Sequence, residues 1–314
     1  MFSYLVRRLL AVIPVMAVVV TVVFLLIHLI PGDPVSVMLG PDATPAQIEA
    51  ARKALGLDRP IPAQLLGFYG RVLRGDLGQS YLLDRPVITA LGERAEPTLM
   101  LMTCALLVAL VIGVPSGIVA AAHRGSVWDR LLMLGSLLGV CVPGFWLSLN
   151  FIYLFAVRLG WLPAAGYASL FDDPLSALRY MVLPATSLGF NQSALIARIS
   201  RSCMLEALQQ DYVRTARAKG LPQRAVIYVH AFRNALVPVV TVIGVTTAVL
   251  IGGAVVTEIV FNIPGLGRLV ISAILRRDYP VVQGVVLVTA ATYVLINLGL
   301  DVLYAFIDPR IRYD

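Results

Sequence analysis

The sequence predicts an all-helical integral membrane protein with six transmembrane helices. It also predicts a small helical extracytoplasmic subdomain between spans one and two, and a short cytoplasmic helix between spans four and five. Of the 314 residues, 59% are apolar and only 14% are charged, whereas soluble globular proteins have roughly 45–50% and about 25%. So few charges cannot cover a soluble fold of this size. The net charge of +7 is spread along the chain, which fits basic cytoplasmic loops better than a nucleic-acid site.

Six apolar segments approach the roughly 20 residues that a helix needs to cross the hydrocarbon core. They are residues 9–30, 98–122, 131–157, 180–197, 235–256 and 281–307. The first is longer than the apolar part of a signal peptide and is therefore predicted to be retained. Polar residues, among them Asn191, interrupt the fourth. Prolines and glycines inside the spans, such as Pro143-Gly144, are expected to be tolerated as kinks.

Two pairs of glycines have the spacing that lets membrane helices approach closely. They are Gly113 with Gly117, and Gly135 with Gly139. We therefore expect close helix packing at both pairs.

An even number of spans places both termini on one side of the membrane. With the termini inside, the cytoplasmic segments carry 13 basic residues and the outer segments carry 12. Long loops cross the membrane largely regardless of charge, and without residues 31–96 the comparison becomes 13 to 5. The sequence thus predicts a multi-pass membrane protein with both termini cytoplasmic.

Residues 31–96 are predicted to form a helical subdomain on the outer face. Thr44 and Gln47 have the spacing of a capping box, and Gly56 is a stop signal for the helix that follows them. A second amphipathic helix is expected to end at Gly75, and its apolar stripe needs either the spans or another protein as a partner. The predicted domains are 1–30 (N-terminus and first span), 31–96 (subdomain) and 97–314 (spans two to six), with a cytoplasmic loop at 198–234.

The loop 198–234 carries seven basic and two acidic residues. Four of its apolar residues share one helical face, namely Leu205, Leu208, Tyr212 and Ala216. Three cations lie on the flanks of this face, namely Arg214, Arg217 and Lys219. Gly220 and Pro222 are expected to end this helix. Such a helix could lie on anionic lipid, pack beneath the bundle, or dock its apolar face into a soluble partner.

The stretch from Asp211 to Leu221, followed by His230-Ala231-Phe232-Arg233-Asn234-Ala235-Leu236-Val237-Pro238, resembles the EAA loop of ABC importer permeases. Thr215 and Ala216 stand where that motif has two alanines, and Arg214 replaces its glutamate. The match is to the dipeptide, oligopeptide and nickel class, which includes glutathione permeases. Further stretches that resemble this class are Pro31-Gly32-Asp33-Pro34, Leu55-Gly56-Leu57-Asp58, Gly75-Asp76-Leu77-Gly78, Leu159-Gly160-Trp161-Leu162-Pro163, Phe261-Asn262-Ile263-Pro264-Gly265-Leu266-Gly267, Arg277-Asp278-Tyr279-Pro280 and Ile307-Asp308-Pro309-Arg310-Ile311-Arg312-Tyr313.

The resemblance implies a permease subunit of the prokaryotic cytoplasmic (inner) membrane that takes up di- or oligopeptides and carries no catalytic residues. Its partners would be a second homologous permease subunit, two ABC ATPase subunits, an extracytoplasmic substrate-binding protein and membrane lipid, with no nucleic acid. The implied ATPase-coupling residues are Asp211, Tyr212, Arg214, Thr215, Ala216, Arg217, Ala218, Lys219, Gly220 and Leu221. Lys53 and Lys219 are the only lysines and neither follows a glycine, which excludes a phosphate-binding P-loop. ATP and Mg are therefore expected on the partner ATPases, and no cofactor on this chain.

Polar residues within a span usually face the bundle interior. Asn150, Asn191, Gln192 and Ser193 are therefore the candidates for the translocation path. Glu258 and Asp301 are expected near span ends, where capping or pairing with an arginine would explain them. The three histidines are isolated in sequence, and no metal site is expected.

Other functions stay open at this stage. The same machinery could carry glutathione or nickel chelates. An intramembrane hydrolase would need a nucleophile and a base at membrane depth. The sequence has no Gly-x-Ser-x-Gly motif, no His-Glu-x-x-His motif and no paired-Asp motif in its predicted spans. A stand-alone secondary transporter would want buried carboxylates and internal repeats, and neither is evident.

Overall fold

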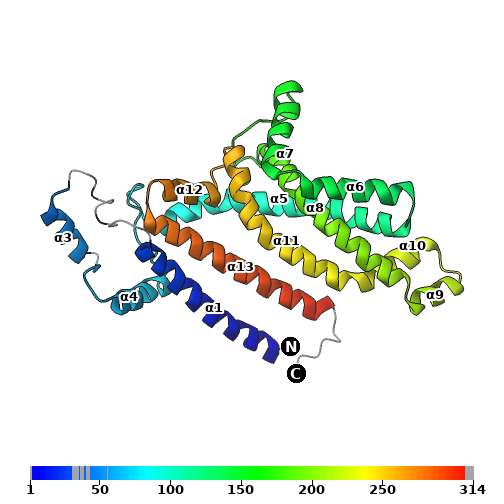
Figure 1. Cartoon of the computed structure of the whole chain (residues 1–314), viewed down its shortest axis with the longest axis horizontal. Coiled ribbons are helices and arrows are strands. Elements are labelled where there is room, and N and C mark those ends of the chain that lie inside the picture. The colour runs from blue at the N-terminus through cyan, green and yellow to red at the C-terminus, as the bar shows by residue number, and fades with distance from the viewer. Residues whose placement is uncertain (1, 30–34, 36–38, 40–42, 55, 308–314) are drawn as a thin grey trace. The chain divides into compact units, whose positions relative to one another are not determined.

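The computed structural model describes residues 2–29, 35, 39, 43–54 and 56–307, and within these ranges it consists of helices and connecting loops without a named strand (Figure 1). The helices are α1 (Phe2–Leu29), α3 (Pro45–Ala54), α4 (Ile61–Leu73), α5 (Val87–Ala122), α6 (Val127–Cys141), α7 (Gly144–Phe151), α8 (Pro174–Leu208), α9 (Asp211–Ala218), α10 (Gln223–Ala225), α11 (Phe232–Val260), α12 (Leu266–Leu275) and α13 (Tyr279–Ile307). Two π-helical segments, Ile152–Arg158 and Val226–Ala231, continue α7 and α10. Contacts divide the chain into two compact units. The first is Met1–Glu96 with Gly265–Leu295, and the second is Pro97–Pro264 with Ile296–Asp314.

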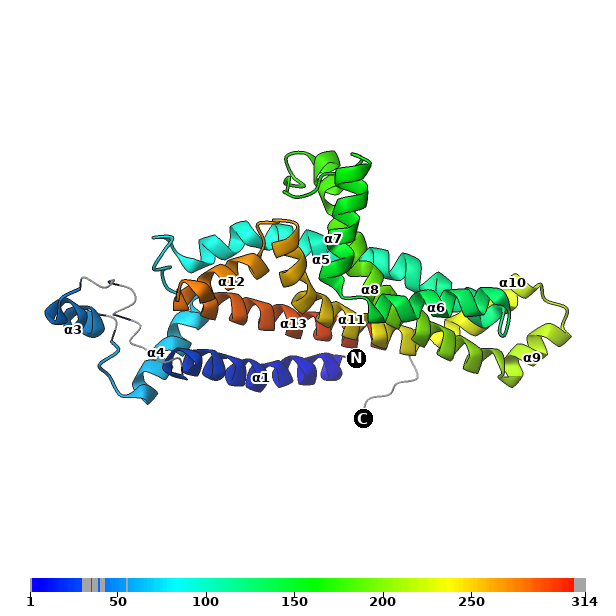
Figure 2. The same ribbon diagram turned by 45° about the horizontal axis from the view of Figure 1, so that its top comes forward.

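Four helical stretches of the described residues are long and apolar enough to cross a membrane. They are Arg7–Leu25, Val87–Ala122, Gln223–Val260 and Tyr279–Val302. A fifth candidate is the pair Val127–Cys141 and Gly144–Arg158, whose two parts are bent by 103°. The predicted third span, residues 131–157, is therefore not one kinked helix, and α7 turns away from α6 (Figure 2).

Pro143 explains the break between α6 and α7. A residue that precedes proline avoids the helical region, and Val142 is extended, with φ −79° and ψ 123°. Pro143 also lacks the N–H that a continuous helix would need. Pro143-Gly144, predicted to be a tolerated kink, instead separates the end of α6 from the start of α7.

The fourth predicted span, residues 180–197, lies inside α8, which is the central helix of the second unit. Helices α6, α7 and α11 all contact α8. The α5 glycines approach it closely, since a Cβ on Gly113 would lie 2.8 Å from the Ile196 Cβ, and one on Gly117 would lie 2.5 Å from the Ser200 Cβ. The predicted close packing at Gly113 and Gly117 is thus confirmed. Because other helices surround α8, its polar residues need not face lipid.

The second glycine pair behaves differently at its two positions. A Cβ on Gly139 of α6 would lie 2.9 Å from the Ala194 Cβ on α8. A Cβ on Gly135 would meet no atom within 4 Å. The prediction therefore holds for Gly139 and is wrong for Gly135.

Glu258 lies two residues before the end of α11 and is completely buried in the second unit. Its Oε1 atom accepts a hydrogen bond of 2.6 Å from the hydroxyl of buried Thr98. This contact joins α11 to α5. The predicted position near a span end is thus confirmed, and the chain folds back after Val260, where the Ile263 N–H donates to the Glu258 backbone carbonyl at 2.8 Å.

In the first unit, the predicted capping box at the start of α3 is confirmed. The Thr44 N–H and hydroxyl both donate to Gln47 Oε1 at 2.9 Å, and the Gln47 N–H donates to Thr44 Oγ1 at 3.4 Å. Gly56 follows α3 with φ +68°, a conformation that favours glycine.

The apolar face of α4 packs on α1, so the spans rather than another protein supply its partner. The rings of Phe68 and Phe24 lie 5.8 Å apart, and the Tyr69 hydroxyl donates to the Ala17 carbonyl at 2.6 Å. Helix α5 begins at Val87, ten residues inside the segment 31–96 that was predicted as the subdomain. The quoted residues 31–34 and 308–313, and Leu55, lie outside the described residues.

Candidate functional site

Helix α9 is separated from α8 by Gln209 and Gln210 and ends at the predicted stop. The Gly220 N–H donates to the Arg217 carbonyl at 2.9 Å, and the Leu221 N–H donates to the Ala216 carbonyl at 3.3 Å. Gly220 has φ +75°, which a residue with a Cβ rarely adopts. Pro222 then starts α10, so α9 is a short, separately ended helix at the turn between two long ones.

The apolar side of α9 faces its own chain. Val213 is 0% exposed and Ala216 is 5% exposed. Both belong to a cluster with residues of α5, α8, α11 and the π-helical segment Val226–Ala231. Its other members are Ile118, Ala121, Met204, Ala207, Val226, Ala231 and Ala235.

This burial revises two details of the predicted helix. The expectation that Ala216 belongs to a face offered to a partner is wrong, because Ala216 is buried within this chain. The predicted continuous face also fails, since α8 ends at Leu208 and α9 starts a new helix at Asp211. Leu205 and Leu208 pack on the cluster, while Tyr212 is 40% exposed. Val213, rather than Tyr212, is the buried residue of this turn. The spacing of apolar residues did not predict this, because the break between α8 and α9 changes the helical register.

The remaining predicted coupling residues lie on the exposed side of α9 and just after the C-terminal end of this helix. These are Asp211, Tyr212, Arg214, Thr215, Arg217, Ala218, Lys219, Gly220 and Leu221, all of which are exposed. Arg214 lies 3.4 Å from Asp211 in a solvent-exposed pair, a kind of contact that contributes little stability. The surface is therefore cationic, with Tyr212 and Leu221 as its large apolar groups.

Tyr212 also links α9 to the start of α11. Burial raises the pKa of the Tyr212 hydroxyl, and a hydrogen bond with the Asn234 side chain lowers it in part. Asn234 donates in turn to the His230 carbonyl at 2.8 Å. Helix α9 thus contacts both long helices that flank the loop.

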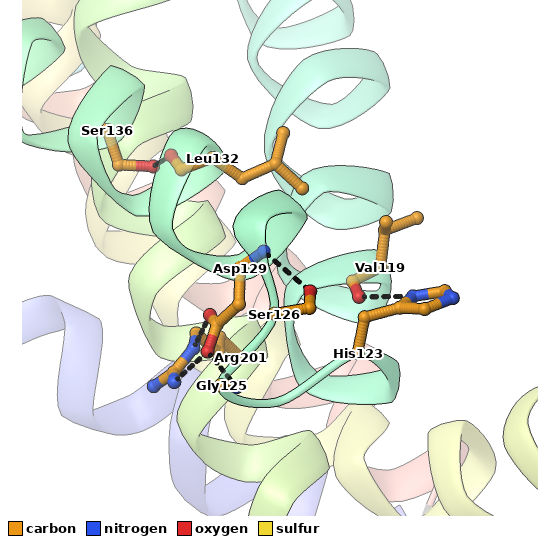
Figure 3. Close-up of polar contacts among 8 residues, drawn as sticks. All are labelled: Val119, His123, Gly125, Ser126, Asp129, Leu132, Ser136 and Arg201. Atoms are coloured by element: carbon orange, nitrogen blue, oxygen red, sulfur yellow. Dashed lines mark hydrogen bonds and ion pairs between the residues drawn. The ribbon is translucent and has the colours of Figure 1, made fainter.

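An ion pair that the sequence analysis did not identify joins α6 to α8 (Figure 3). Arg201 Nε lies 2.6 Å from Asp129 Oδ1, and Arg201 Nη2 lies 2.8 Å from Asp129 Oδ2. The Gly125 N–H donates to Asp129 Oδ2 at 3.0 Å. Two parallel N–H···O bonds of this kind fix geometry as well as charge.

The first turn of α6 positions Asp129 for this contact. Ser126 caps the helix by accepting a hydrogen bond of 3.3 Å from the Asp129 N–H, as Figure 3 also shows. A serine followed three residues later by an acidic residue is a recognisable helix start. That signal predicts the cap, but it cannot predict a partner 72 residues away in the chain.

The four candidate path residues do not form one group. Asn191 Nδ2 donates to the Val142 carbonyl at 3.0 Å, which satisfies a carbonyl at the break before Pro143. Asn191 Oδ1 is buried and accepts no hydrogen bond from the described residues. Ser193 is buried and donates to the Phe190 carbonyl of its own helix at 2.7 Å. Gln192 is half-buried. Asn150 is exposed and donates to the Trp146 carbonyl.

Comparisons with known proteins agree along the whole chain. Residues 113–313 match the family model described as the binding-protein-dependent transport system inner membrane component, and residues 1–102 match the model of its N-terminal region. A protein of Brucella abortus named as a peptide transport system permease is 46% identical over 314 residues, covering all of both chains. A dipeptide transport system permease of Alkalihalophilus pseudofirmus is 42% identical over 333 residues, again with full coverage of both.

Other relatives and solved structures point the same way. A glutathione transport system permease of Pectobacterium atrosepticum is 42% identical over 313 residues, with full coverage of both chains. Two inward-facing structures of the MetNI methionine ABC transporter match 70% of this chain, with TM-scores of 0.57 and 0.59 at 19% and 18% identity. They cover 96% and 97% of the matched chains and show a common fold. The chain belongs to the family of inner membrane components of binding-protein-dependent transport systems.

Proposed function

We propose that this chain is the channel-forming subunit of an ATP-driven importer for di- and oligopeptides. Full-length relatives named as peptide and dipeptide permeases support the cargo class. The observation that carries the mechanism is α9, a short helix whose Val213 and Ala216 are buried in its own chain while its cationic side is exposed. That side suits a docking surface on a separate protein.

In the proposed topology, six spans cross the inner membrane and both termini are cytoplasmic. The four long apolar helical stretches and the bent pair supply five spans. Helix α8 supplies the sixth, and its polar residues are tolerated because neighbouring helices surround it. The domain division into 1–30, 31–96 and 97–314 and the outer position of residues 31–96 remain part of this proposal.

In the proposed coupling mechanism, the exposed side of α9 docks on one of two ATPase subunits, which bind ATP and Mg. Movement of α9 reaches α8, α11 and α5 because its buried side packs on all three. The ion pair between Arg201 and Asp129 carries the movement of α8 to α6. A second, homologous permease subunit completes the channel, and a substrate-binding protein delivers cargo from outside.

Hydrogen bonding supports an order among the proposed path residues. Asn191 is the strongest candidate, because its Oδ1 atom lacks a donor among the described residues. Ser193 is the weakest, because its hydroxyl is satisfied within its own helix. Gln192 and Asn150 remain proposed without a distinguishing contact.

Glutathione is a second candidate cargo, favoured by the glutathione permease that is 42% identical over the full chain. Glutathione is itself a tripeptide, so both cargoes share amide groups and free carboxylates. A nickel chelate is the remaining alternative within this class.

The test is uptake of a labelled dipeptide into proteoliposomes that contain this subunit and its copurifying partners. Uptake should require ATP and the binding protein. Arg217→Glu should reduce ATPase association and uptake, whereas Arg74→Glu, an equal charge change at an exposed residue of the predicted outer subdomain, should not. Uptake without ATP, or by this subunit alone, would refute the proposed function.

A further inference from the structure

A cavity of about 500 Å³ lies within the first unit. This volume falls in the range of roughly 300–1,000 Å³ that is typical of small-molecule sites. Helix α4, the loop of residues 76–84 and the start of α13 line it. Three of the quoted sequence stretches meet here through Gly56, Gly78 and Pro280, and the proposed function gives none of them a role.

The lining away from solvent carries amide, phenol and aromatic groups. Gln64 Nε2 donates to the Leu57 and Arg59 carbonyls at 3.2 and 2.7 Å, while Gln64 Oε1 is buried and accepts no hydrogen bond from the described residues. Burial and the Asp278 carboxylate raise the pKa of the Tyr81 hydroxyl, against a smaller lowering by Arg71. The neutral Tyr81 hydroxyl and the Gln64 Oε1 acceptor, which is unsatisfied among the described residues, therefore belong to the lining of the same cavity.

The rim carries charges of both signs. Arg59, Arg71, Asp76 and Asp84 line the cavity and are exposed. Among the described residues, none of the four is joined to another by an ion pair. A ligand with one free ammonium and one free carboxylate can contact both signs at once.

The wall formed by residues 76–84 is held in place before any ligand binds. The Asp278 carboxylate accepts hydrogen bonds from the Ser80 hydroxyl and from the Tyr81 and Leu82 N–H groups, the last two at 3.3 and 3.4 Å. Ser80 N–H also donates to the Arg85 carbonyl at 3.0 Å. Preorganisation of this kind lowers the entropic cost of binding.

We propose that this cavity, which lies between α4 and the ends of the α1 and α13 spans, binds a short peptide with free termini. Backbone amides of the peptide bind Gln64 and Tyr81, its termini contact the charged rim, and side chains contact Phe68. A protein surface would instead need about 800 Å² of contact on each partner, which a recess of this size does not offer. The inference rests on the proposed function, since it takes peptides as the cargo class.

The first experiment measures binding to the full-length chain, without partners, in lipid nanodiscs. Calorimetry with the tripeptide alanyl-phenylalanyl-alanine should show one saturable site. The N-acetylated and C-amidated forms should each bind about tenfold more weakly, as expected when one charge-assisted contact is lost. Absence of binding by the unmodified tripeptide, or equal binding by all three forms, would overturn the proposal.

Matched variants place the site. Gly67 lines the cavity and Gly70 lies one turn away, outside it, and a Cβ at either would meet no atom within 4 Å. Gly67→Leu should therefore fill the cavity and weaken binding at least tenfold, whereas Gly70→Leu should not. Both changes favour the helix, so neither should prevent folding. Arg71→Gln should weaken binding, with Arg74→Gln as its control.

Two further outcomes separate the possible failures. If Gly67→Leu leaves tripeptide affinity unchanged but abolishes docking of the binding protein, the cavity is a protein-docking site and the proposal is wrong. If the complete transporter imports the tripeptide with ATP while the isolated chain does not bind it, only the cavity assignment fails. Binding at the cavity without ATP-driven uptake would instead refute the proposed function.

Discussion

The ion pair between Asp129 and Arg201 should contribute measurably to stability. Its two N–O distances are 2.6 and 2.8 Å, and the exposed fractions of the two side chains are 7% for Asp129 and 27% for Arg201. Removal of one partner from a buried pair costs about 3–5 kcal/mol because a charge is left uncompensated. Since Arg201 is partly solvated, we expect about 2–3 kcal/mol for Asp129→Ala or Arg201→Ala.

The double variant should cost little more than either single variant, because no unpaired charge remains. A double-mutant cycle should therefore give a coupling energy of about 2 kcal/mol. The assay is reversible unfolding of the purified chain in mixed detergent, followed by circular dichroism. The matched control is the cycle for Lys53 and Glu49, which are 3.7 Å apart and 67% and 70% exposed. That cycle should give about 0.3–0.5 kcal/mol.

Strictly additive costs for Asp129 and Arg201 would refute the reasoning, because additivity means that the two groups do not interact. A charge-reversed pair, Asp129→Arg with Arg201→Asp, should restore only part of the stability. Asp129 lies in the first turn of α6, where the helix dipole favours an acidic group and disfavours a cation. Full restoration would contradict this orientation effect.

Three further predictions concern single positions. Gly117→Val should reduce stability by at least about 2 kcal/mol through overpacking, because a Cβ at this position would lie 2.5 Å from the Ser200 Cβ. The same unfolding assay measures this loss, and wild-type stability of the variant would contradict the close packing. Asn191→Leu should cost about 1–3 kcal/mol by leaving the Val142 carbonyl unsatisfied, and an unchanged unfolding midpoint would contradict that bond. Ala216→Arg should lower both the yield of folded protein, measured by gel filtration, and the association with the ATPase, measured by pull-down, since Ala216 is 5% exposed. Loss of association with an unchanged yield would instead place Ala216 at the partner surface.

Local features were predictable from sequence because their signals and their effects lie within one turn of chain. The Thr44–Gln47 capping box and the stop at Gly220 are of this kind. The glycines at 113 and 117 were also informative, since close packing needs small residues at that spacing. The ion pair of Asp129 with Arg201 was not, because its partners are 72 positions apart and no periodicity relates them.

The sequence also did not show which surface covers the apolar side of a helix, or how far the chain turns at a proline. Hydrophobic spacing marks which residues of a helix are buried, but it does not say whether its own chain or a partner covers them. In α9 the chain itself covers Val213 and Ala216. Pro143 shows the same limit, because a proline signal is compatible with a kink or with a complete break, and only the 103° bend decides between them.

The packing around α8 constrains how a movement of α9 can reach the rest of the second unit. Backbone contacts at Gly113 and Gly117 leave no space for α8 to compress against α5, and close-packed interiors transmit displacement rather than absorb it. The bidentate pair at Arg201 fixes α6 to the same helix. In the proposed coupling mechanism, a displacement of α9 should therefore move α5, α6 and α8 together. The break at Val142-Pro143 lies between α6 and α7 and is bridged by Asn191 of α8. Helix α7 also contacts α8 directly, and the Ser148 hydroxyl donates to the Ser187 hydroxyl at 3.0 Å. We therefore expect α7 to follow α8 even when the bond between Asn191 and Val142 is lost.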